Sequence, residues 1–124
     1  MAISVSWDEQ AIRYEFVGLW DWAELEAVHA DVFDVIRAET GTISLIFDLT
    51  QSIDLPIGAL SAMRRMFTYA PPNLGLLVVI TTDDAATMTF GMLGNFDATL
   101  GKRIIVRDTL TAARHALHDF YASH

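Results

Sequence analysis

The sequence contains no cysteine, which excludes both disulfide bonds and thiolate chemistry. It also lacks a long apolar run. The longest one, residues 74–80, is interrupted by Gly75 and is far shorter than the ~20 residues that a membrane helix needs. The N-terminus shows no basic segment followed by an apolar stretch, as a secretory signal peptide would. These absences predict a cytoplasmic protein with no membrane insertion.

Positive charge is also scarce. The chain has 8 basic and 16 acidic side chains and a net charge of −8, which argues against nucleic acid as a partner. Residues 1–62 carry 11 acidic and 2 basic side chains, whereas residues 63–124 carry 5 and 6. We therefore expect one end of the domain to be acidic and the other nearly neutral, a distribution that can orient a charged partner.

Apolar residues, in contrast, make up 52% of the chain. That is a large share for a domain of 124 residues, and apolar side chains left on a surface usually mark an interface. The length predicts a single domain, residues 1–124.

Two periodic segments open the chain. Residues 3–8 and 12–16 alternate between apolar and polar side chains, as half-buried strands do. The link between them is too short for a crossover helix, so it predicts an antiparallel hairpin.

After the hairpin, helices and strands alternate. Asp21 and Glu24 form a capping box for a helix that runs to about Glu39, with Gly41 as its stop signal. The later segments predict strands at 43–47, 74–80 and 103–106 and helices at 56–69, 85–95 and 110–121. The order β-β-α-β-α-β-α-β-α predicts an α/β fold with a mixed, mostly parallel five-stranded sheet.

The segment after the third strand carries a recognisable pattern. The strand ends in Asp48-Leu49-Thr50, and Ile53-Asp54-Leu55-Pro56-Ile57-Gly58 follows. In both element order and this pattern the chain resembles the STAS domain of sulfate transporters and bacterial anti-sigma-factor antagonists. Those proteins carry Asp-Leu-Ser or Asp-Leu-Thr, a loop, and then Ile-Asp-Ser-Ser-Gly at the start of a helix.

The resemblance implies a STAS-like fold and a protein partner such as an anti-sigma-factor-like kinase or another regulator. In the antagonists a kinase phosphorylates the serine just before the glycine and so switches partner binding off. Here the loop is about two residues shorter, and Leu55, Pro56 and Ile57 stand at the candidate positions, none with a hydroxyl. We therefore expect no phosphorylation switch at that position, and Thr50, Ser52 and Ser61 remain as weaker acceptors.

The same segment predicts a partner-binding surface. Ile57 falls on the polar side of a helix expected to start at Pro56, which makes it an apolar anchor within a polar rim. The candidate partner-binding residues are Thr50, Gln51, Ser52, Asp54, Leu55, Ile57, Ser61, Arg64 and Arg65. In an alternative interpretation, Ile57 folds back over the loop as a hydrophobic staple.

Catalytic and metal-binding patterns are weak. Asp48 at a strand end could suggest a phosphoryl receiver, but a carboxylate that hydrogen-bonds the loop is far more common. His115 and His118 lie three apart on the last helix without a third ligand, which is typical of a solvated face. His29 lies on the apolar face of its helix and predicts a buried, hydrogen-bonded histidine. There is no phosphate-binding loop, nucleophile elbow or dinucleotide fingerprint, so we expect no enzyme, no cofactor and no metal.

Two methionines suggest self-association. Met88 and Met92 are four apart on the predicted third helix, facing away from Ala86, Phe90 and Leu93. They predict a homodimer contact, unless neighbouring loops cover them. A second function class, binding of a small apolar ligand or lipid, would require an internal cavity, whereas a filled core with apolar residues outside favours protein contact.

Overall fold

The computed structural model describes residues 2–123. The strands are β1 (Ile3–Asp8), β2 (Ala11–Gly18), β3 (Ile43–Ser52), β4 (Leu74–Ile80) and β5 (Ile104–Arg107). The helices are α1 (Trp22–Ala38), α2 (Ala59–Phe67), α3 (Asp84–Phe96), α4 (Ala98–Gly101) and α5 (Leu110–Ser123). Within the described part of the chain, no helix is both long and apolar enough to cross a bilayer.

The five strands form one sheet in the order β1-β2-β3-β4-β5. β1 pairs antiparallel with β2, and every other pair is parallel. The predicted α/β fold with a mixed, mostly parallel sheet is confirmed. β3 and β4 lie in the middle and are buried on both faces, because each is an almost continuous apolar run.

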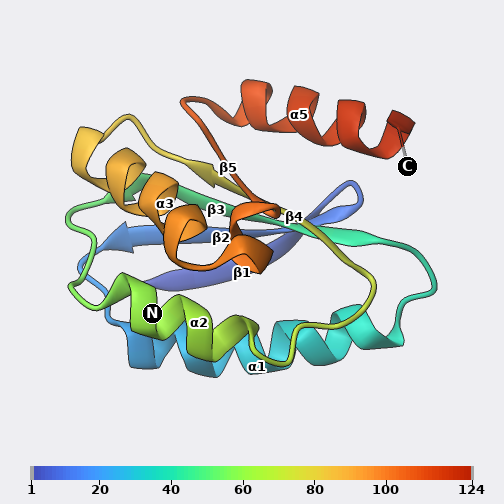
Figure 1. The fold of residues 1–124 in the computed structure, drawn as a ribbon, viewed down its shortest axis with the longest axis horizontal. Coiled ribbons are helices and arrows are strands. Elements are labelled where there is room, and N and C mark those ends of the chain that lie inside the picture. Colours follow the sequence, from blue (N-terminus) through green and yellow to red (C-terminus); the bar gives the residue numbers. More distant parts are fainter. Residues whose placement is uncertain (1, 124) are drawn as a thin grey trace.

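The helices cover the sheet unequally. α1, α2 and α3 supply Val32, Met63 and Phe90 to one large core, together with Tyr14 and Phe47 from the strands. α5 covers the other face through a smaller cluster that includes Ala113 and Leu117. Figure 1 shows α1 and α2 below the sheet and α5 above it.

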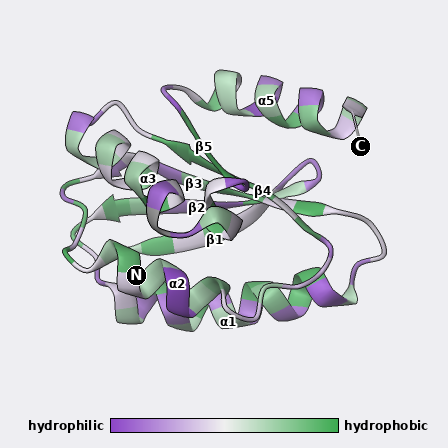
Figure 2. Ribbon diagram, viewed as in Figure 1, coloured by the Kyte–Doolittle hydropathy of each residue, from purple (hydrophilic) through white to green (hydrophobic). Residues whose placement is uncertain are grey.

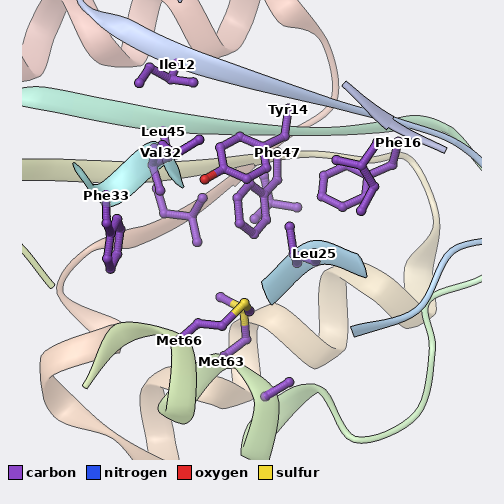
Figure 3. Close-up of a cluster of buried hydrophobic side chains, with 14 of the residues drawn as sticks. Ile12, Tyr14, Phe16, Leu25, Val32, Phe33, Leu45, Phe47, Met63 and Met66 are labelled. Carbon is purple, nitrogen blue, oxygen red and sulfur yellow. The ribbon is translucent and has the colours of Figure 1, made fainter. Parts of the chain in front are cut away.

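The larger core is tightly filled around aromatic rings. The ring centroids of Tyr14 and Phe47 lie 4.8 Å apart, and those of Phe16 and Phe47 lie 5.5 Å apart (Figure 3). Met63 and Met66 of α2 are buried below these rings (Figure 3). Apolar residues gather along the central strands, while the strongly hydrophilic residues lie on loops and outer helix turns (Figure 2).

Two predicted boundaries are wrong. The second helix begins at Ala59 and not at Pro56, after Gly58 in the left-handed region at φ +92°. The third strand continues to Ser52 because Gln51 and Ser52 pair with Val17 and Gly18, beyond a register shift at which β3 has one more residue than β2. The short helix α4 was not predicted.

Candidate partner-binding site

The site lies at the carboxyl ends of the parallel strands, where open α/β sheets place their binding sites. The loop after β3 runs over residues 53–58 and leads into α2. It lies beside the β2–α1 link, since the Ile53 N–H donates to the Gly18 carbonyl at 3.0 Å.

Asp48 holds the start of this region in place. Its side chain is nearly buried, and one oxygen, Oδ1, accepts hydrogen bonds from the Thr50 N–H at 3.1 Å and the Thr50 hydroxyl at 2.7 Å. The other, Oδ2, accepts from the Arg13 guanidinium at 2.6 Å. Burial raises the pKa of Asp48, but the bonds from Thr50 and Arg13 outweigh it and hold the pKa below its usual value. The interpretation of Asp48 as a loop-stabilising carboxylate is confirmed.

Two tryptophans, Trp20 in the β2–α1 link and Trp22 at the start of α1, hold the loop itself. The indole Nε1–H of Trp20 donates to the Ser52 hydroxyl at 2.8 Å. The Trp22 indole donates to the Ile57 carbonyl at 2.9 Å and to the Pro56 carbonyl at 3.2 Å. The two indole rings meet edge to face with centroids 4.9 Å apart. Both ends of the loop are thus fixed to the rest of the domain.

Three apolar side chains project from this fixed backbone into solvent. Ile57 is 96% exposed, Leu19 70% and Ile53 66%. We call these three residues the strand-end surface. The staple interpretation of Ile57 is therefore wrong, because a side chain folded over the loop would be covered. Ile57 also precedes α2, so it does not belong to that helix's polar face as predicted.

The predicted rim residues divide into two groups. Thr50, Gln51 and Asp54 are exposed beside the strand-end surface, and Ser61 is exposed in the first turn of α2. Ser52 and Leu55 are partly buried, the former by its bond to Trp20 and the latter against the core.

Arg64 and Arg65 do not join that rim as free cations. Arg65 bonds Glu26 of α1 at 2.6 Å, and Arg64 lies 3.7 Å from Asp97 at the end of α3. The two arginines tie α2 to its neighbours on opposite sides. Both arginines are exposed, as expected for the polar side of α2, and each also has an acidic neighbour outside that helix.

Sequence reasoning missed Leu19, Trp20 and Trp22 as contributors to the site. The available signal was the dense apolar segment Leu19–Trp22 around the helix-capping Asp21. A link between a strand and a capped helix is ordinarily polar, so apolar residues there need either burial or a partner. The structure buries Trp20, half-buries Trp22 and exposes Leu19.

The histidines lie away from this site. The Nδ1 atom of His29 lies 2.9 Å from the Tyr14 hydroxyl, while its Nε2 is buried with no hydrogen-bond partner among the described residues. His118 lies 2.6 Å from a Glu9 oxygen. Within residues 2–123 no group of three or more potential ligands could hold a metal ion.

Hollows in the surface are open. A groove of about 380 Å³ lies between β1 and α1, and a small hollow of about 30 Å³ lies under the loop beside Ser52 and Asp83. Met88 and Met92 are exposed on α3, as the predicted self-association requires, while Ala86, Phe90 and Leu93 are buried as predicted.

The comparisons with known proteins identify no family. No protein-family model matches the chain, and no curated protein matches it.

Proposed function

We propose that this chain is a non-enzymatic protein-interaction module of a regulatory kind, a divergent relative of the STAS-domain anti-sigma-factor antagonists. It docks through the loop after β3 and the start of α2. One observation chiefly supports this proposal: Leu19, Ile53 and Ile57 are exposed beside a loop that three indole hydrogen bonds hold in place.

A rigid, apolar surface is suited to binding a protein. Ordering a loop costs free energy on association, and a loop already fixed in place avoids much of that cost. Apolar side chains at the centre and hydrogen-bonding groups around them are the usual arrangement of an interface. Thr50 and Gln51 supply such groups here.

Charge indicates the chemistry of the partner. Asp21 and Asp54 are both exposed next to the strand-end surface. A matching partner would offer an apolar pocket with lysine or arginine at its edge. Such a partner could be an anti-sigma-factor-like kinase or another regulator, and binding would proceed without a phosphorylated serine at the loop.

The test is partner capture from a lysate of the source cells. We expect the tagged wild-type chain to retain a specific protein, and Ile53→Asp with Ile57→Asp to reduce retention at least about tenfold, since two hot-spot side chains are lost and acid is added to an acidic rim. Tyr69→Asp is the control: it adds one carboxylate at another apolar position, 81% exposed, beyond the opposite end of α2. Retention by the double variant, with melting temperatures unchanged, would refute the proposal.

Binding of a small apolar ligand or lipid is the second candidate, and the groove between β1 and α1 favours it. However, this groove is open along the sheet edge, and the larger core is filled by aromatic contacts. A ligand would leave much of its surface in water. Native mass spectrometry of the purified chain distinguishes the two candidates, because a lipid-binding domain would carry a defined added mass.

A further inference from the structure

The edge strand β1 is unusual in being unprotected over most of its length. Exposed sheet edges normally carry lysine, proline, a bulge or an inward-pointing charge, which prevent pairing with another chain. β1 has the sequence ISVSWD, which contains no lysine and no proline, and it pairs with β2 in an unbroken register, without a bulge. The opposite edge, β5, is only four residues long, ends in Arg107 and follows Lys102 and Arg103.

The main chain of β1 offers free hydrogen-bonding groups along this edge. The Val17 N–H donates to the Ala2 carbonyl at 2.8 Å, so this carbonyl faces β2. Antiparallel pairing alternates strictly, which directs the groups of Val5 and Trp7 outward. At the start of the strand, the N–H groups of Ala2 and Ile3 both donate to one Glu24 carboxylate oxygen at 3.1 Å, so the free part of the edge follows the Ile3 N–H.

The side chains beside this edge form an apolar groove. Val5 is 43% exposed and Trp7 51%, although both point to the helix-covered face of the sheet. Across from them, Val28 and Val35 of α1 line the same groove of about 380 Å³. The helix stops short of covering these side chains, so the groove and the free main-chain edge lie together.

We infer that the occupant of this edge is a second copy of the chain, paired antiparallel through β1 about a twofold axis at Val5. That register places Val5 opposite Val5, Ile3 opposite Trp7, and Ser4 opposite Ser6. Apolar residues face apolar residues on one side of the sheet, and hydroxyls face hydroxyls on the other. It also pairs the Val5 main-chain groups of both strands, and each Trp7 N–H with the Ile3 carbonyl of the other copy, while the Ile3 N–H stays bonded to Glu24. The two copies then form one continuous sheet.

Charge favours a second copy over a basic peptide. The acidic residue of the strand, Asp8, is already bonded to Arg114 of α5 at 2.7 Å. Asp31 is the single charged side chain among the residues that line the groove. A basic segment would thus find little to bind, whereas the strand matches its own copy residue by residue. This interface is separate from the strand-end surface and independent of the proposed function.

Cross-linking tests the register, since the chain has no cysteine of its own. Directly opposite residues of a hydrogen-bonded antiparallel pair have Cα atoms about 5.5 Å apart, within disulfide range. Val5→Cys should therefore form a reducible dimer under mild oxidation. Ser4→Cys, whose opposite residue is Ser6, should form it about tenfold more slowly or less, because its own copy is out of range.

Sedimentation at high micromolar concentration tests the interface. We expect the wild-type chain to be dimeric and Val5→Glu to be a folded monomer, because two carboxylates would then stand opposite each other beside Asp31. Met88→Glu with Met92→Glu should stay dimeric. A monomeric wild type, equal cross-linking of the two cysteine variants, or dissociation by the methionine variant alone would overturn the inference, and the last result would assign the contact to α3.

Discussion

At the scale of single residues, His29 shows how far a sequence pattern reaches. Its place on the apolar face of α1 predicts burial with a hydrogen bond, and both are confirmed through Tyr14. The unsatisfied Nε2 was not predictable, since only the packing around Phe33 and Phe67 decides whether an acceptor can reach it. Burial lowers the pKa of His29 to about 4, and the main chain of Met66 opposes this shift only weakly. Burial also raises the pKa of Tyr14.

This histidine should make the fold sensitive to mild acid. The unfolded chain takes up a proton near the ordinary histidine pKa of 6.5, whereas the folded chain does so only near 4. As the pH falls between these values, protonation favours the unfolded state, and the free energy of unfolding should drop by about 3 kcal/mol.

Urea denaturation across that pH range measures the effect. His29→Gln keeps a partner for the Tyr14 hydroxyl but cannot titrate, so its free energy of unfolding should vary much less over the same range. Parallel pH profiles for the variant and the wild type would show that His29 is not the responsible group.

Exposure of single side chains at the site was only partly predictable. Asp48 was correctly interpreted because an aspartate at a strand end has few good alternatives to bonding its own loop. Ile57 was correctly expected to be exposed, but for a wrong reason, because it precedes the helix. The partners of Arg64 and Arg65 lie on α1 and at the end of α3, and local spacing carries no information about such contacts.

At the scale of elements, long-range pairing explains the boundary errors. Polar residues after Asp48 favour a loop, yet β3 continues to Ser52 because Val17 and Gly18 of β2 are available to pair with it. With this extension the loop comes later in the chain, and α2 begins at Ala59, after Gly58. The left-handed conformation of Gly58 favours glycine. The element itself was predictable from its apolar spacing, but its first residue was not.

Glycine placement around α3 and α4 gives an element-scale prediction. A Cβ on Gly101 would lie 2.6 Å from the Cα and 3.0 Å from the carbonyl oxygen of Gly94. Both are main-chain atoms, which cannot move away by a change of rotamer. Gly101→Ala should therefore force the two helices apart and cost about 1–3 kcal/mol of unfolding free energy.

The matched control lies on α3, the helix that carries Gly94. A Cβ on Gly91 would meet nothing within 4 Å, so Gly91→Ala should raise stability by about 1 kcal/mol through helix propensity. Chemical denaturation of both variants measures the contrast. A similar effect of the two substitutions would mean that the close approach of α3 and α4 is not what limits residue size there.

At the scale of the whole molecule, topology was the most predictable feature. A short link predicts the hairpin, and helix-length connections predict parallel neighbours, so the strand order follows from few alternatives. The distribution of exposed apolar residues was not predictable, because it depends on how far α1 extends over β1 and on which loops meet at the strand ends. Both candidate interfaces lie where the neighbouring helix or loops leave apolar side chains uncovered.

One ion pair joins the two ends of the fold. Asp8, at the end of β1, accepts two hydrogen bonds from the Arg114 guanidinium of α5, at 2.7 and 3.1 Å. The bond from Arg114 lowers the pKa of Asp8, against the opposing effect of burial. α5 buries only Ala113 and Leu117 fully, whereas α1 buries five residues, so α5 depends more on such a contact.

Removing this pair should loosen α5 before the rest of the domain. In Asp8→Asn we expect faster amide hydrogen exchange throughout α5 and little change in α1, because α1 is held by the larger core. The variant should also lose part of the acid dependence below pH 3.8, where the unfolded chain binds a proton that the wild-type Asp8 still resists. Glu9→Gln is the control, since its contact with His118 is solvent-exposed on both sides and should contribute little. If exchange in α5 rises equally in the two variants, or not at all in Asp8→Asn, the attachment of α5 rests on its apolar contacts and not on this ion pair.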